Sequence, residues 1–156
     1  MDDLRHRREK ALQETSSPLN TDAAIHQEVD FPGSPSRLYE ALLDERQFGA
    51  LTCAPAEIQA EAGGRFSLFG GRVTGRHVEL VPGQRIVQAW RVEAWPPGVY
   101  SLVRFELTEQ DSGTHLVLDQ TGFPPQDRGA LDGNWPRMYW EPLRRHVGAG
   151  SDTALR

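Results

Sequence analysis

With 156 residues and a formal net charge of −5 at neutral pH, the chain is long enough for one domain with a sizeable core. Hydrophobic residues make up 38% and charged residues 25%, which excludes a disordered or fibrous class, and the acidic balance argues against a nucleic-acid partner. The longest apolar runs, such as Leu116-Val117-Leu118, fall far short of the roughly 20 residues that cross a bilayer, so no membrane partner is expected.

The first ordered element is expected to be a strand over residues 24–31, after a flexible tail over residues 1–23. The tail mixes charges of both signs and ends in residues that break helices. In the strand, apolar side chains recur with the period of a strand, at Ile25, Val29 and Phe31. Pro32 and Gly33 end it.

A short helix is expected to follow this strand. Ser34 is a good N-cap, and Pro35 suits the first helical position. Apolar residues then recur at helical spacing, at Leu38, Tyr39, Leu42 and Leu43. The pattern predicts a helix to about Asp44 and a second short turn through Phe48.

The middle of the chain is expected to form an antiparallel meander. Glycine and proline turn signals separate five strands, at residues 65–69, 72–81, 84–94, 99–108 and 114–121. Short turns of this kind join neighbouring antiparallel strands.

Alternation within the strands predicts a sheet with one dry and one wet face. Val103, Phe105 and Leu107 oppose Arg104 and Glu106. The dry face therefore needs a cover.

The cover is predicted to be an amphipathic helix over residues 133–147. Its apolar side chains repeat at steps of three and four residues, at Trp135, Met138, Tyr139, Leu143 and Val147. Pro136 fits the first turn, but Pro142 lies inside the helix and should bend it. The domain is expected to span residues 24–148, with a C-terminal tail over residues 149–156.

Several spaced motifs carry a resemblance to a known family. They are residues 66–75 (Phe-Ser-Leu-Phe-Gly-Gly-Arg-Val-Thr-Gly), 79–82, 86–91, 95–101 and 113–116, then Trp135, Tyr139, Pro142 and Leu143. In this order they resemble the family related to the C-terminal domain of the activator of the ninety-kilodalton heat-shock chaperone's ATPase, within the START-like (SRPBCC) superfamily. The resemblance implies an α+β helix-grip fold, in which a curved antiparallel β-sheet has two short helices after the first strand and a long C-terminal helix packed across it.

The resemblance leaves three functions open. The first, motivated by the aromatic side chains of the sheet and the C-terminal helix, is non-catalytic binding of a small hydrophobic or amphipathic molecule in the cavity between them. The alternatives are a chaperone cofactor, with a chaperone or another protein as partner, and a cyclase- or hydrolase-like enzyme. The eukaryotic co-chaperone has a separate N-terminal domain with an asparagine- and tryptophan-rich motif, whereas residues 1–23 here hold only Asn20 and no Trp. A monomer and a homodimer are both compatible with the sequence.

Large side chains are the candidate site residues. The expected lining of a cavity under the C-terminal helix is Phe48, Phe66, Trp90, Phe105, Trp135, Met138 and Tyr139. These side chains either fill the core or wall an open cavity in which the polar tips of Trp and Tyr orient a ligand.

No catalytic residue, metal ligand or cofactor site is expected. The histidines form no ligand motif and are predicted to lie at the surface or at strand edges, although two could converge across strands: His6, His26, His77, His115 and His146. Acidic residues of the strands are expected to pair with arginines across the sheet. Cys53, the only cysteine, excludes an internal disulfide, favours a cytoplasmic protein and is expected to be a small buried thiol.

Overall fold

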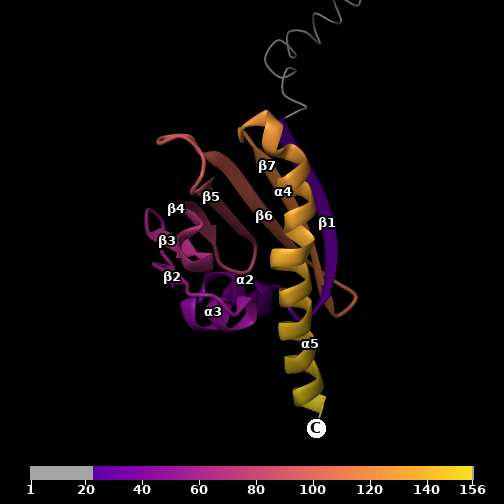
Figure 1. The fold of residues 1–156 in the computed structure, drawn as a ribbon. Helices are drawn as coiled ribbons and strands as arrows, with labels where there is room; N and C mark the ends of the chain where they lie inside the picture. The colour runs from indigo at the N-terminus through magenta and orange to yellow at the C-terminus, as the bar shows by residue number, and fades with distance from the viewer. Residues whose placement is uncertain (1–22, 156) are drawn as a thin grey trace, which may run out of the picture.

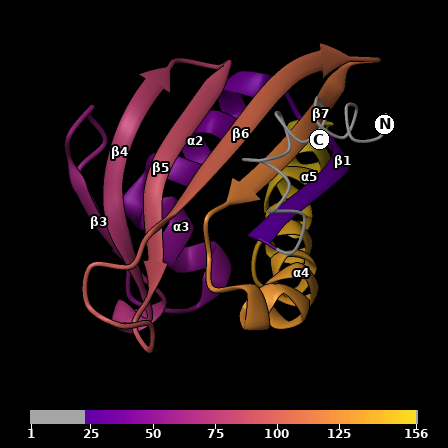
Figure 2. The same cartoon turned by 90° about the horizontal axis from the view of Figure 1, so that it is seen from above.

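The computed structural model describes residues 23–155, and the side chains of residues 23–148. The tail expected over residues 1–23 lies, apart from Ala23, outside the described residues. The described chain forms a seven-stranded antiparallel sheet with helices over one face (Figures 1 and 2). The α+β helix-grip architecture is thus confirmed.

The sheet has the strand order β1-β7-β6-β5-β4-β3-β2. Its members are β1 (Ala24–Pro32), β2 (Glu57–Ile58), β3 (Arg65–Leu68), β4 (Val73–Val81), β5 (Arg85–Val92), β6 (Ser101–Gln110) and β7 (Gly113–Thr121). The strands from β3 to β7 form the expected meander, whereas β1 returns to pair with β7 over its whole length. The two-residue strand β2 was not predicted, because two residues are too few for a periodic signal.

Two short helices follow β1, as expected. They are α2 (Pro35–Leu43) and α3 (Glu45–Thr52). The Ser34 hydroxyl accepts a hydrogen bond from the Arg37 backbone N–H at 3.2 Å, which confirms the predicted cap. The helix α3 ends at Cys53, which adopts the left-handed conformation with φ of 55°. The prediction of a buried thiol is wrong, because this terminal position turns Cys53 to the surface.

The C-terminal helix is continuous but irregular. It consists of α4 (Arg128–Trp135), a π-helical segment η4 (Pro136–Trp140) and α5 (Glu141–Leu155), and it follows the 3-10 turn η3 (Pro125–Asp127). It begins before residue 133 and continues past residue 147, where the prediction ended. The backbone N–H of Glu141 bonds to the carbonyl of Pro136, five residues back. The irregularity therefore precedes Pro142, because a proline ring crowds the carbonyl four residues earlier and the turn widens to relieve it.

The core lies between the sheet and the helices. The inward positions of β6 are closed to solvent, since Val103, Phe105 and Leu107 are at most 6% exposed. Figure 2 shows the helices gathered on this inner face. The opposite face, called the outer face here, carries the alternate residues of the strands and is covered by no helix of residues 23–155.

The C-terminal helix also protects the free edge of β1. The guanidinium groups of Arg128 and Arg144 donate to the carbonyls of Ala24 and Asp30, at 3.2 and 3.1 Å. An edge strand whose carbonyls are bound in this way is less available for pairing with another chain. Within residues 23–155, none of the helices combines the length and the apolar composition needed to cross a membrane.

Candidate functional site

An aromatic cluster fills most of the space between the sheet and the C-terminal helix. Trp135 lies at its centre, with ring centroids 5.5 Å from both Trp90 and Trp140 in stacked arrangements and 4.4 Å from Tyr139. Phe105 of β6 meets Trp135 edge-on at 5.9 Å. Helical spacing explains the arrangement, because Trp135 and Tyr139 are one turn apart.

The polar tips of these aromatic side chains are bound within the protein. The Trp135 indole N–H donates to Gln120 Oε1 at 2.9 Å, and the Trp140 N–H donates to Gln27 Oε1 at 2.7 Å. The Trp90 N–H donates to the Tyr139 hydroxyl at 3.4 Å, a long contact. Burial raises the pKa of Tyr139, and the Trp90 hydrogen bond only partly opposes that shift. The three indole donors of the cluster therefore do not depend on a ligand.

The sequence analysis did not identify the two glutamines that bind the indoles. Gln27 stands between inward-facing Ile25 and Val29, and Gln120 follows Leu116 and Leu118 at the period of a strand. Period-2 alternation could have placed both on the inner face. Their polarity disguised them as solvent-facing residues.

A small pocket remains beside the cluster, with a volume of about 140 Å³. Four of the seven predicted cavity residues line it: Trp90, Trp135, Met138 and Tyr139. The rest of its wall consists of Phe69, Arg72, Val73, Val92, Leu131 and Asn134. This lining, drawn from residues 69–139, includes no carboxylate, histidine or cysteine.

The other three predicted residues are buried but do not line this pocket. Phe48 and Phe105 pack against Tyr139 at centroid distances of 5.5 and 6.2 Å and so fill the core. Phe66 packs against His77 at 5.2 Å. The structure thus gathers the predicted set around one core and leaves only part of it against open space.

His77 and Gln88 are buried polar residues of the inner face. They are direct partners on β4 and β5 and are 2% and 4% exposed. Both ring nitrogens of His77 and the Oε1 of Gln88 lack a hydrogen-bond partner among the described residues. Desolvation lowers the pKa of His77 to about 4. The expectation of a surface or edge histidine is wrong here, because inward-facing Val73 and Gly75 precede His77 at period 2.

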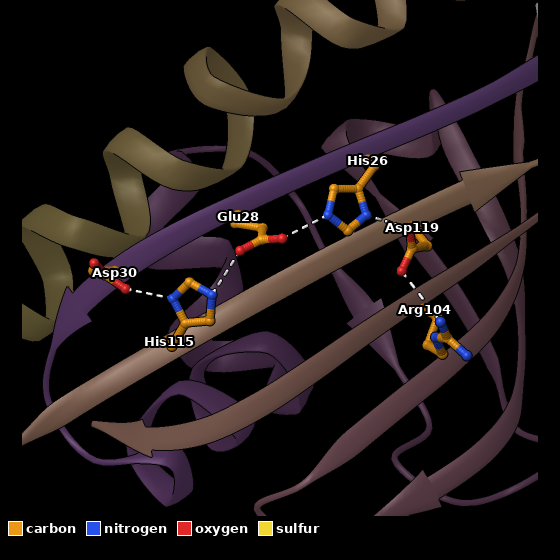
Figure 3. A network of polar contacts seen from close by, with 6 residues as sticks. All are labelled: His26, Glu28, Asp30, Arg104, His115 and Asp119. Atoms are coloured by element: carbon orange, nitrogen blue, oxygen red, sulfur yellow. Dashed lines mark hydrogen bonds and ion pairs between the residues drawn. The ribbon is translucent and has the colours of Figure 1, made fainter. Parts of the chain in front are cut away.

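The outer face carries a chain of charged side chains along β1 and β7 (Figure 3). His26 contacts Glu28 and Asp119, each at 2.7 Å. His115 contacts Glu28 at 3.0 Å and Asp30 at 2.6 Å. Two histidines therefore do converge, with the Glu28 carboxylate between them.

The geometry of this network of charged side chains requires both histidines to be protonated. Each imidazole places both ring nitrogens against carboxylate oxygens, and a neutral imidazole has only one N–H to donate. Hydrogen bonds donated to Asp119 and Glu28 raise the pKa of His26, and those donated to Asp30 and Glu28 raise the pKa of His115. The same two imidazoles lower the pKa of Glu28.

The charged chain continues across the sheet through arginines. Arg104 of β6 lies 3.2 Å from Asp119 and 3.7 Å from Glu106. Arg85 of β5 lies 3.0 Å from Glu79 and 3.6 Å from Glu106. The expected cross-strand pairing is therefore present between Arg104 and Asp119, its direct partner on β7, whereas Glu106 lies on the same strand as Arg104. No group of three or more side chains among residues 23–148 has the arrangement of a metal site.

The sequence of this chain is similar to those of known proteins. The family model described as activator of Hsp90 ATPase homolog 1-like protein matches residues 32–148. The human activator of 90 kDa heat shock protein ATPase homolog 1 is 31% identical over 121 residues, which is 78% of this chain and 36% of the human protein. An uncharacterised protein of Schizosaccharomyces pombe is 32% identical over 136 residues, covering 87% of this chain and 40% of that protein.

The fold is also similar to solved structures. A crystal structure of an Hsp90 activator from Plasmodium falciparum superimposes with a TM-score of 0.74 at 23% identity, covering 81% of this chain and 96% of that chain. The chain spans little more than a third of the length of its human relative.

Proposed function

Because the chain belongs to the activator of Hsp90 ATPase homolog 1-like family, we propose that it is a non-catalytic protein-interaction domain whose partner is a chaperone of the Hsp90 class. The observation that carries the proposal is the filled space under the C-terminal helix, of which only about 140 Å³ stays open. Pockets for drug-sized ligands usually measure roughly 300–1,000 Å³. The remaining space fits one side chain of a partner better than a whole lipid.

The pocket has the character of an anchor site. Trp90 and Trp135 form buried walls, while Met138 and Asn134 are half-buried and Arg72 is exposed. Burying one large apolar side chain contributes about 1.5–3 kcal/mol. Residues that dominate binding tend to insert into desolvated pockets of this kind.

A pair of variants on one strand tests the proposal. Val92→Phe adds a ring to the pocket wall, whereas Val87→Phe adds the same ring to the outer face of the same strand, β5. We expect the full chain to bind the Hsp90-class chaperone of its own organism and to raise its ATPase rate. Val92→Phe should weaken binding at least tenfold, and Val87→Phe should leave it unchanged.

Two results would contradict this proposal. If the unaltered chain neither binds the chaperone at tens of micromolar nor changes its ATPase rate, the partner is wrong. If it binds but Val92→Phe binds equally well, the partner stands and the pocket is not its anchor.

The second candidate function is binding of a small apolar molecule about the size of one aromatic ring. The observation that favours it is the volume of the pocket, because an engineered apolar cavity of about 150 Å³ in another protein binds benzene. Asn134 and Arg72 could bind a polar substituent at the mouth of the pocket. Phenol and indole at millimolar concentration should raise the melting temperature of the chain but not that of Val92→Phe. Equal shifts in both proteins would place these compounds elsewhere.

A further inference from the structure

A second hollow is lined by residues of β2, β3 and β4 and includes outward-facing side chains of these strands. Its lining is more polar than that of the pocket beside the aromatic cluster. This groove has a volume of about 790 Å³, and its lining includes Arg65, Ser67, Thr74, Arg76 and Tyr100. Tyr100 is 48% exposed, one of three large apolar side chains so open to solvent among the described residues. The groove is therefore polar, and its wall includes two arginines, two glutamates (Glu45 and Glu57) and one aromatic ring.

The two arginines of the groove face each other without a described counter-charge. Arg65 on β3 and Arg76 on β4 are direct cross-strand partners. Like charges placed directly opposite each other destabilise a sheet. Arg76 donates to the carbonyl of Gly63 at 3.0 Å, and neither guanidinium has a carboxylate partner among the described residues. The arrangement gathers two solvent-exposed guanidinium groups and their positive charge at one place.

The other arginines of the strands are treated differently. Arg85 and Arg104 each bind two carboxylates across the outer face. Arg91 donates to the backbone carbonyls of four residues between Glu93 and Val99 and lies 5.8 Å from the Tyr100 ring centroid. Among the five strand arginines, only Arg65 and Arg76 are thus left available for an outside anion.

We propose that this groove docks a short acidic segment of a partner protein, with a carboxylate held between Arg65 and Arg76 and an apolar side chain on Tyr100. Guanidinium groups bind carboxylates in a planar, two-point geometry that suits this role. The groove crosses three strands, a distance of roughly 10 Å, which about three extended residues span. The same lining includes Glu57 and Glu45, and these two carboxylates favour a segment with one or two carboxylates over a long polyanion. The proposal does not depend on which protein supplies the segment.

The test measures binding of labelled peptides to the full chain by fluorescence anisotropy. The probe is a fluorescein-labelled pentapeptide, amidated at its C-terminus, with the sequence Gly-Glu-Phe-Glu-Gly, and its controls carry Gln or Lys in place of Glu. Binding should be specific to the Glu peptide and should weaken as salt is raised. Equal binding of the Gln peptide, or displacement by free glutamate at the same carboxylate concentration, would overturn docking of a peptide at this site.

Two charge reversals separate this groove from general electrostatics. Arg65→Glu should weaken peptide binding at least tenfold, yet its melting temperature should not fall, because the new carboxylate lies opposite Arg76. Arg145→Glu makes the same charge change on an exposed position of α5 and should bind the peptide within twofold of the parent chain. If Arg65→Glu binds as well as the parent, or if Arg145→Glu loses as much affinity as Arg65→Glu, the groove is not the docking site.

Discussion

The two faces of the sheet differ in their contact with water, although the same strands form both. The inner face buries apolar and aromatic side chains, and even its polar groups are dry, as His77 and Gln120 show at 2% and 0% exposure. The outer face arranges histidines, arginines and carboxylates in contact with water. Interactions on the dry face are individually strong, whereas solvated ion pairs are weak and screened by salt. Most of the stability of the domain therefore comes from the inner face.

The contributions of the two faces to stability also depend on pH in opposite directions. His77 has a pKa lowered to about 4 and favours its neutral form. The outer histidines, His26 and His115, have raised pKa values and favour the cation. Above pH 6.5 the inner face keeps its full contribution, while the outer chain loses its contribution as pH rises through the raised pKa values. One sheet thus contains two proton-linked elements with opposite signs.

The largest expected effect comes from breaking the aromatic cluster. Trp135→Ala removes a side chain that is 2% exposed and should lower the free energy of unfolding by about 3–5 kcal/mol. It also leaves the buried Oε1 of Gln120 without its donor. Urea denaturation measures the loss. The matched control on the outer face, Tyr100→Ala, should stay within about 0.5 kcal/mol of the parent chain. Similar losses in the two variants would erase the distinction between the faces.

The next effect is the pH dependence that His77 imposes. Its pKa is about 6.5 in the unfolded chain and about 4 in the folded one. The contribution is fully present above pH 6.5 and is lost as pH falls toward 4, a change on the order of 3 kcal/mol. His77→Leu should flatten this part of the stability profile and should not destabilise the chain at pH 7, because an unpartnered polar group is replaced by an apolar one. Unfolding curves at several pH values decide this, and parallel profiles would contradict it.

The sequence predicted the parts of the structure that depend on local pattern. Alternation in β6 and helical spacing at Trp135 and Tyr139 placed these apolar side chains on the inner face, as the structure confirms. The capping of α2 by Ser34 was also readable, because it depends on neighbours within one turn. The pocket could be predicted only as a set of large side chains. Whether such a set fills a space depends on packing, which no periodicity encodes.

The outer chain of charges was beyond prediction for another reason. The network of His26 and His115 depends on the pairing of β1 with β7, strands separated by most of the domain in sequence. A shift of one residue in that register would turn every side chain to the other face. The sequence suggested that two histidines could converge but did not indicate which, because the register of distant strands is a tertiary property.

A smaller loss of stability should follow substitution of Gly75, an inward-facing glycine of β4. A Cβ atom on Gly75 would lie 1.9 Å from the Ala89 carbonyl oxygen and 2.6 Å from the Phe66 ring. Because backbone and ring must shift, Gly75→Ala should cost about 1–3 kcal/mol. The neighbouring outward residue provides the control, since Thr74→Ala should change stability by no more than about 0.5 kcal/mol. Thermal unfolding of both variants makes the comparison, and a Gly75→Ala protein as stable as the parent chain would show that the inner face is not closely packed there.

The smallest effect on stability, and the most specific in its pH dependence, should come from Glu28→Gln. Glu28 accepts hydrogen bonds from the Nε2 atoms of His26 and His115, so the variant removes one negative charge from between two cations. The pKa values of both imidazoles should fall, and NMR titration of their ring protons measures each directly. The loss of stability should be present near pH 6, where both imidazoles are protonated, and should disappear as pH rises through their raised pKa values. It should also shrink at high salt, because all of these groups face solvent.

The control is Glu109→Gln, at an exposed position of β6 outside the network, which should leave both titrations unchanged. If the pKa values of His26 and His115 are unchanged in Glu28→Gln, the charge of Glu28 does not contribute to holding their protons, and the network consists of independent pairs with Asp119 and Asp30.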